Sequence, residues 1–250
     1  MKKIYILICS CYNILFTIIE KIFFLKIKKI NQSNLNAIGF EIIKIQNNAE
    51  IYEPEKIIKS NPFMTKDIVK KEDIDNIINF LFIKNNLKKI ISDKTGFYFS
   101  IDYIISYTTF NIPESEINKE IYANQWHLDK PFSKNTLKII VPLNFQNYYN
   151  GGIKIFNFDQ TKLIKKNSSL FLAKKSFEME NKKGEILLFY PNLCFHKAGN
   201  PRLGEGRKQI MLQLNPSNKW CLNDSIYQKQ FKIEPKFPFF NYLRDKKTLI

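Results

Sequence analysis

A long series of short apolar segments, separated by turn residues, constrains the fold of this 250-residue chain more than any other feature. From residue 97 onward the segments are rich in β-branched and aromatic residues, and helical periodicity is absent. Turn residues such as Asn150-Gly151-Gly152 and Asn200-Pro201 separate them. We predict strands at residues 97–110, 121–127, 137–145, 153–158, 169–173, 185–190 and 207–214.

The region before residue 97 combines one strand pattern with one helical pattern. Residues 40–45 are partly alternating and predict a strand. Residues 65–93 carry apolar side chains at helical spacing and predict a helix that starts at Thr65 and breaks at Asn85-Asn86. Many short strands after a helical section indicate a mainly β fold with flanking helices, an antiparallel jelly roll or cupin-like barrel. We expect the aromatic residues between 237 and 242 to pack back on this barrel.

Residues 1–30 form a separate N-terminal segment in this reading, and residues 31–250 form a single domain. The stretch from Ile4 to Ile19 carries no charge, but it is short for a membrane span of ~20 residues and contains polar side chains. Two readings stay open: an apolar helix that docks on the catalytic domain, or a helix that lies in a membrane interface with its lysines toward lipid phosphates. We therefore expect a cytoplasmic protein, with peripheral membrane contact through residues 1–30 as the alternative.

The composition limits the function only weakly. The formal net charge is +16, but the lysines are scattered along the chain, so we read them as a solvated surface and expect no specific nucleic-acid partner. The four cysteines match neither a zinc site nor a disulfide framework by their spacing. The sequence leaves the oligomeric state open.

The chain contains only two histidines, and both lie where a metal site would require them. His127 and Asp129 are two residues apart, so a strand would place their side chains on the same face. His196 follows a turn and an apolar run, which would bring it to the mouth of the barrel. Two imidazoles and one carboxylate are the ligands of an Fe(II) site that leaves open positions for a co-substrate and oxygen.

Arg207 follows His196 by eleven residues and opens an alternating segment that would point it inward. A guanidinium holds a carboxylate by two parallel hydrogen bonds, which suits the far carboxylate of an iron-chelating 2-oxo acid. Arg202 is a competitor for this role, but it lies in a turn and we expect it to be exposed.

These motifs resemble the phytanoyl-CoA dioxygenase-like branch of the Fe(II)/2-oxoglutarate-dependent oxygenases. The matching residues span roughly 97–216, and a Gly39-Phe40 pair resembles the entry to such domains. The chain departs from the family at Ala198 and Gln209, where hydroxyl side chains are common. The stretches that carry the resemblance are Gln125-Trp126-His127-Leu128-Asp129, residues 137–144 followed by Gly151-Gly152, residues 184–191, and His196 with Arg207.

The resemblance implies a double-stranded β-helix with Fe(II) on His127, Asp129 and His196, and with 2-oxoglutarate on Arg207. It implies a dioxygenase that uses O2 to hydroxylate an unactivated carbon of a small-molecule substrate while 2-oxoglutarate is decarboxylated to succinate. A non-catalytic binding barrel of the same fold and a nucleic-acid-modifying oxygenase remain the alternatives.

Overall fold

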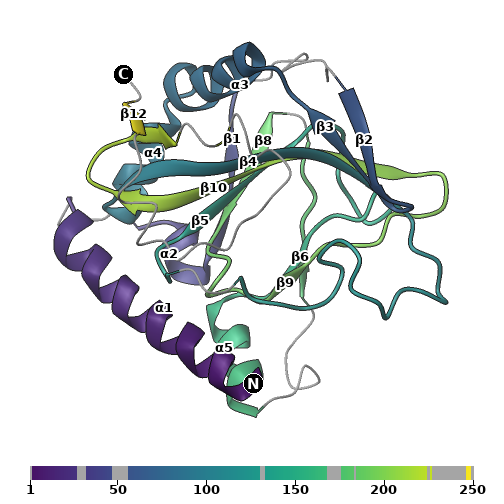
Figure 1. Cartoon of the computed structure of the whole chain (residues 1–250), viewed down its shortest axis with the longest axis horizontal. Coiled ribbons are helices and arrows are strands. Elements are labelled where there is room, and N and C mark those ends of the chain that lie inside the picture. The colour runs from purple at the N-terminus through teal and green to yellow at the C-terminus, as the bar shows by residue number, and fades with distance from the viewer. Residues whose placement is uncertain are drawn as a thin grey trace.

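The computed structural model describes residues 2–26, 32–46, 56–129, 133–167, 176–182, 184–223, 226 and 246–248, without the side chains of residues 2–7, 9 and 246–248. Two sheets dominate this part of the chain (Figure 1), and their strands pair antiparallel except for the parallel pair of β11 and β4. The strands are β1 (Phe40–Lys44), β2 (Lys56–Asn61), β3 (Met64–Ile68), β4 (Tyr98–Phe110), β5 (Leu137–Pro142), β6 (Lys154–Ile155), β7 (Phe177–Glu178), β8 (Glu185–Phe189), β9 (His196–Lys197), β10 (Gly206–Ser217), β11 (Cys221–Asn223) and β12 (Lys246–Thr248). The helices are α1 (Lys2–Phe24), α2 (Asn34–Ile38), α3 (Lys71–Ile78), the π-helical turn η1 (Asn79–Lys84), α4 (Leu87–Thr95) and α5 (Phe158–Asn167).

The large sheet has the strand order β1-β8-β5-β10-β4-β11-β12, and the β2-β3 hairpin also pairs with β4. The small sheet has the order β7-β6-β9 and lies below the large one in Figure 1. The predicted mainly β fold with flanking helices, a cupin-like jelly roll, is therefore confirmed.

Side-chain alternation divides the core in two. On β5, Leu137, Ile139 and Val141 pack with residues of α3, η1 and α4 on one face of the large sheet. Ile140 points to the opposite face and packs with Ile155 of the small sheet. The period of two is the reason that one strand serves both a helix-covered core and the space between the sheets.

A register shift in the β4–β10 pairing changes which residues of β4 face the small sheet. Phe99 and Ile101 belong to the core under the helices, whereas Tyr103 and Ile105 belong to the core between the sheets. The shift lies between Gln213 and Leu214, and an extra residue in one strand of a pair moves all later side chains to the other face. Tyr103 of β4 therefore faces the space between the two sheets.

The predicted helix at 65–93 is wrong at its start and correct in its remainder. Residues Met64–Ile68 form strand β3, and helix α3 begins only at Lys71. Asp67 is buried and accepts a hydrogen bond of 2.9 Å from Ser106 of β4, which holds this segment in the sheet. The break at Asn85-Asn86 is confirmed, since Asn86 adopts a φ of 55° before α4 begins.

The predicted strand at 121–127 is wrong. The segment is a loop in which only His127 makes an isolated bridge. Asn124 stabilises the loop because its side chain bonds to the backbone of Ile117, Lys119 and Ile121. An asparagine that satisfies local backbone groups in this way offers the chain an alternative to a sheet.

The predicted strand at 153–158 is shorter than expected and ends before a helix. Only Lys154–Ile155 form β6, and α5 begins at Phe158. Asn157 and Gln160 form reciprocal hydrogen bonds between side chain and backbone, of 2.9 and 3.2 Å, which cap the start of α5. The predicted strands at 40–45, 97–110, 137–145, 185–190 and 207–214 match β1, β4, β5, β8 and β10 with small changes at their ends. The predicted strand at 169–173 and the aromatic residues between 237 and 242 lie outside the described residues.

Candidate active site

His127 and His196 come from segments far apart in the sequence and face each other across an isolated bridge. The backbone N–H of each donates to the carbonyl of the other at 3.1 Å, and the ring centroids lie 4.4 Å apart. His196 is the first residue of β9 in the small sheet, where it pairs with Ile155. The bridge therefore fixes the two imidazoles side by side at the edge of the small sheet.

Both imidazoles are oriented in the same way. Nδ1 of His127 lies 2.8 Å from the carbonyl of Gln125, and Nδ1 of His196 lies 2.9 Å from the carbonyl of Cys194. A carbonyl can only accept, so each Nδ1 carries a proton and each Nε2 is the ring nitrogen available to a metal ion. Hydrogen bonds of this kind orient histidines that bind metals.

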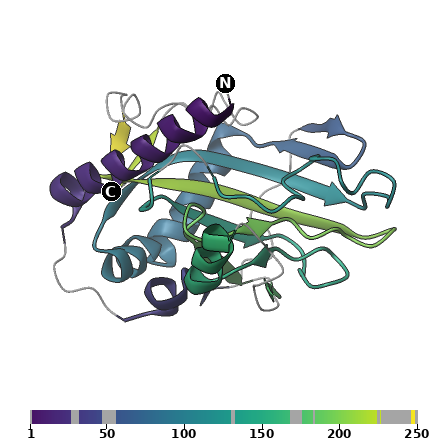
Figure 2. The same cartoon turned by 90° about the horizontal axis from the view of Figure 1, so that it is seen from below.

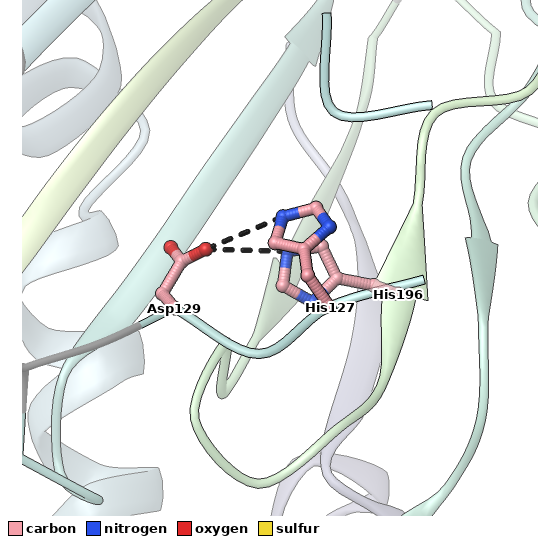
Figure 3. A group of neighbouring side chains, drawn as sticks. All are labelled: His127, Asp129 and His196. Carbon is pink, nitrogen blue, oxygen red and sulfur yellow. Dashed lines mark ion pairs between the residues drawn. The ribbon is translucent and has the colours of Figure 1, made fainter. Parts of the chain in front are cut away.

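Asp129 completes a compact group of three ligand atoms (Figure 3). Its Oδ1 lies 3.5 Å from Nε2 of His127 and 3.6 Å from Nε2 of His196. The backbone N–H of Asp129 donates to the carbonyl of Pro191 at 3.2 Å, which ties this segment to the end of β8. One ligand atom from each of the three residues lies within 4.8 Å of the others, so the group could hold a metal ion.

The second oxygen of Asp129 is bound to Lys138, a residue that the sequence reasoning missed. Nζ of Lys138 forms a short ion pair with Oδ2 of Asp129; the Lys138 side chain is buried, and that of Asp129 is only 11% exposed. Burial alone would raise the pKa of Asp129, but Lys138 and the two histidines outweigh it and hold that pKa well below its usual range. Burial lowers the pKa of His196 to about 3, against the opposing effect of Asp129, so this imidazole is neutral at pH 7.

Arg207 is the second residue of β10 and is buried inside the molecule. Its Nη1 donates to the carbonyl of Gly151 at 2.7 Å, whereas its Nε has no hydrogen-bond partner among the residues that the structure describes. Burial lowers the pKa of Arg207, while the neighbouring Tyr107 and Tyr122 oppose that change. A buried guanidinium with a free donor is costly unless a ligand completes its hydrogen bonds.

A cavity of about 420 Å³ connects the metal-ligand group with Arg207. This volume is within the range of ~300–1,000 Å³ that is typical of small-molecule sites. The side chains of Lys66, Lys138 and Arg207 bring positive charge to it, against the one carboxylate of Asp129. The other lining residues are Met64, Tyr103, Ile105, Tyr107, Tyr122, Ala123, His127, Ile140, Ile153, Phe189, His196, Ala198, Gln209 and Met211.

The structure thus brings all four predicted site residues, His127, Asp129, His196 and Arg207, to one cavity. Arg202 is exposed and lies with its guanidinium 4.1 Å from the ring centroid of Tyr149. One sequence signal could have identified Lys138, since it is the only charged residue in an otherwise apolar strand, Leu137–Pro142. A lysine on a strand of this kind requires a buried partner.

No family model matches the chain. No curated protein matches it in sequence either. Among solved structures, SnoN, a non-heme α-ketoglutarate-dependent epimerase from nogalamycin biosynthesis, is similar with a TM-score of 0.54 and 12% identity, over 73% of this chain and 80% of that chain. EctD from S. alaskensis, with bound Fe, is similar with a TM-score of 0.52 and 14% identity, over 79% of this chain and 83% of that chain. At these identities the likeness shows the fold.

The chain therefore has the jelly-roll fold found in non-heme iron enzymes that depend on 2-oxoglutarate. Its donor set also suits the metal: two imidazoles and a carboxylate on one side of an ion are the ligands of non-heme Fe(II) sites with open positions. The free Nε of Arg207 fits a second, anionic group in the same cavity. The resemblance to the phytanoyl-CoA dioxygenase-like oxygenases stays a prediction.

Proposed function

We propose that this chain is an Fe(II)/2-oxoglutarate-dependent dioxygenase that hydroxylates an unactivated carbon of a small-molecule substrate. The observation that carries the proposal is the pairing, in one cavity, of a His-Asp-His ligand group with a buried arginine whose Nε is free. The similar enzyme SnoN is described as α-ketoglutarate dependent, which supports the same co-substrate here.

His127, Asp129 and His196 would hold the iron, and Arg207 would hold the far carboxylate of 2-oxoglutarate. The bound iron and co-substrate supply the oxidation, in which O2 is consumed and succinate and CO2 are formed. Lys138 keeps Oδ2 of Asp129 occupied and thereby leaves Oδ1 toward the two imidazoles. Gly151 fixes Arg207 through its carbonyl, so the guanidinium is oriented before the co-substrate arrives.

The apolar and aromatic lining supports a small-molecule substrate rather than a nucleic acid. Tyr103, Ile105, Met211 and Phe189 surround the space beside the ligand group. Such a lining excludes water from the reacting carbon, which is a requirement for a controlled oxidation. The identity of the carbon that is attacked is set by the substrate that fits this space.

Binding of 2-oxoglutarate tests the proposal directly. We expect the protein to bind 2-oxoglutarate in the presence of Fe(II), or of Mn(II) under air, by calorimetry. Arg207→Gln should weaken this binding by about 10- to 100-fold, because one charged donor pair is worth roughly 1.5–3 kcal/mol. Arg202→Gln, at the exposed arginine, is the matched control and should bind as the parent does.

Succinate formation separates the enzyme from a binding barrel of the same fold. With Fe(II), 2-oxoglutarate, O2 and a mixture of metabolites, the protein should form succinate, and Asp129→Asn should not. A protein that binds neither the metal nor 2-oxoglutarate would contradict the proposal. If both bind and no candidate substrate stimulates succinate formation above the Asp129→Asn background, the binding-barrel alternative is favoured.

A further inference from the structure

Helix α1 is fixed to the rest of the protein by one of its faces. Tyr12 and Phe16 on this face are buried and stack with ring centroids 4.1 Å apart. Oγ1 of Thr17 accepts a hydrogen bond of 2.9 Å from the backbone of Lys134. The carboxylate of Glu20 is buried and accepts hydrogen bonds from Ser133 and from Asn135, the latter at 3.0 Å. The helix ends against the start of β4, where the N–H of Lys26 donates to the carbonyl of Gly96 at 2.8 Å.

The opposite face of α1 is apolar and open to solvent. α1 lies at the outside of the molecule in both views (Figures 1 and 2). Six exposed residues on and directly after α1 recur at intervals of three and four, which places them on one side of a helix; Ile14 and Phe23 are also exposed but lie outside this row. Exposed fractions are 50% at Ile8, 55% at Leu15, 51% at Ile18 and 68% at Ile22, and Leu25 and Cys11 continue the same row. We call these six residues the α1 apolar row.

This row is unusual for a surface. A single exposed isoleucine needs no explanation, but a continuous apolar row on a helix marks a surface that is covered by something else. No helix among the described residues is long and apolar enough to cross a membrane. The hydrogen bonds of Glu20 also hold α1 flat against the protein. A partner of this row must therefore contact the exposed face of α1 along the length of the helix.

The charges beside the row select the kind of partner. The exposed charged side chains described on α1 and directly after it are lysines, Lys21 and Lys26, and the exposed Lys134 lies next to Thr17. The one carboxylate of the helix, Glu20, is buried on the other side. A second copy of this chain would bring lysines against lysines, and each copy carries a formal charge of +16. An anionic lipid surface offers hydrocarbon to the row and phosphate to the lysines.

We propose that the α1 apolar row lies in the interface of a membrane that contains anionic lipids, with α1 parallel to the membrane surface. The row enters the boundary between headgroups and acyl chains, and the lysines contact the lipid phosphates. This inference does not depend on the proposed enzymatic activity, because none of its residues lines the cavity of the active site.

Flotation of the full chain with lipid vesicles tests the proposal. The protein should float with vesicles of phosphatidylcholine and phosphatidylglycerol in a 7:3 ratio, and much less with phosphatidylcholine alone. Leu15→Gln, Ile18→Gln and Ile22→Gln combined should weaken binding by at least about tenfold, since they remove apolar groups from the interface. The matched control combines Ile57→Gln and Leu203→Gln, two exposed apolar residues elsewhere, and should float as the parent does. Lys21→Gln and Lys26→Gln should each weaken binding about fivefold.

Two outcomes of flotation overturn the proposal. One is that no vesicle is bound; the other is that binding survives the triple substitution, because then scattered lysines alone attract the lipid. Light scattering on a sizing column tests the alternative that a second copy of this chain covers the α1 apolar row. A dimer that the triple substitution dissociates, while the control does not, also overturns the proposal.

A fluorescent label at Cys11 gives a readout on protein in which the apolar side chains of the α1 apolar row are unchanged. Cys11 is exposed within the row, and Cys194 and Cys221 are buried. With Cys9→Ser to direct the label, a polarity-sensitive dye at Cys11 should shift to the blue when anionic vesicles are added. An unshifted label on protein that floats would place the contact elsewhere and overturn the proposal.

Discussion

Lys138 neutralises Asp129 in the protein without a metal ion. Lys138 is buried, Asp129 is largely shielded from solvent, and the ion pair joins Nζ to Oδ2. Lys138→Met would leave the carboxylate buried without its cation, and breaking such a pair costs ~3–5 kcal/mol. We therefore expect a lower unfolding free energy without metal, but a larger stabilisation by Mn(II) than in the parent, because the added cation then replaces the lost charge.

Denaturant unfolding with and without Mn(II) measures both effects. Lys154→Met is the matched control, since Lys154 pairs with Glu178 at 3.3 Å in a more exposed setting, and it should change neither quantity by more than about 1 kcal/mol. An unchanged stability of Lys138→Met in the absence of metal would show that the ion pair does not hold Asp129.

Cys194 should be unreactive although it adjoins the active site. Burial raises the pKa of its thiol, and the opposing effect of Lys165 is smaller. The thiolate is the reactive form, so we expect alkylation at Cys11 and not at Cys194 between about pH 7 and 9 in the native protein. Above its usual pKa the thiol ionises in the unfolded chain only, so stability should fall as the pH rises beyond about 9.

Mass spectrometry of peptides after iodoacetamide treatment measures this difference in reactivity. A denatured sample, in which all thiols react, serves as the control. The Cys194→Ala variant should lose part of the alkaline decline in stability. Rapid alkylation of Cys194 in the native protein would contradict the burial of this side chain.

The sequence indicated the four candidate residues by type and order, but the argument for two of them was geometrically wrong. Strand alternation was expected to place His127 and Asp129 on one face. The structure instead has a loop there, and the reciprocal bridge to His196 and the bond from Asp129 to Pro191 orient the side chains. These contacts join residues more than sixty positions apart, so local pattern could not predict them.

Among the elements, the loop around Gly151 positions Arg207 and depends on a close approach of two backbones. A Cβ at Gly199 would lie 2.4 Å from the carbonyl oxygen of Gly152 and 2.7 Å from the carbonyl carbon of Gly151. Gly199→Ala must therefore push this loop away and move the carbonyl that accepts from Arg207. We expect a loss of about 1–3 kcal/mol in stability and weaker 2-oxoglutarate binding.

Gly206→Ala is the matched control, because its Cβ would make ordinary contacts of 3.4 Å or more on β10. The unfolding free energy of this variant should stay close to that of the parent, and its affinity for 2-oxoglutarate should stay within a factor of about two of the parent's, as expected of a tolerated change. Thermal unfolding and calorimetry on the two variants compare them. Equal effects in both would show that the loop tolerates displacement.

The errors at the level of elements have a common physical origin. Apolar periodicity correctly predicted the helical residues of α3 and α4, because their buried faces follow helical spacing. It failed at β3, where the bond between Asp67 and Ser106 draws a short polar segment into the sheet. It also missed α5, although the Asn157 and Gln160 pair is a capping signal that can be read from sequence.

At the scale of the whole molecule, the alternation of apolar residues carried most of the predictable information. Alternation with a period of two marks the strands, and apolar spacing of three and four marks the helices that cover one face of the large sheet. This distinction is enough to predict a jelly roll with flanking helices. It contains nothing about where a strand shifts its register. The shift beside Gln213 decides that Tyr103 faces the cavity, and it became visible only in the folded sheet.

The two sheets should be tied together by the ligands of the proposed site. His196 lies in the small sheet and Arg207 in the large one, so a metal with bound 2-oxoglutarate would connect them. Each ligand that binds only the folded state stabilises it by ~2.7 kcal/mol at a hundredfold excess over its Kd.

Mn(II) alone should raise the melting temperature, 2-oxoglutarate alone should raise it little, and both together should raise it most. Asp129→Asn should lose the metal response and, with it, the added effect of 2-oxoglutarate. Differential scanning fluorimetry compares the protein without ligand, with Mn(II), with 2-oxoglutarate and with both. An equal rise in melting temperature on adding 2-oxoglutarate with and without metal would show that the co-substrate binds apart from the His-Asp-His group.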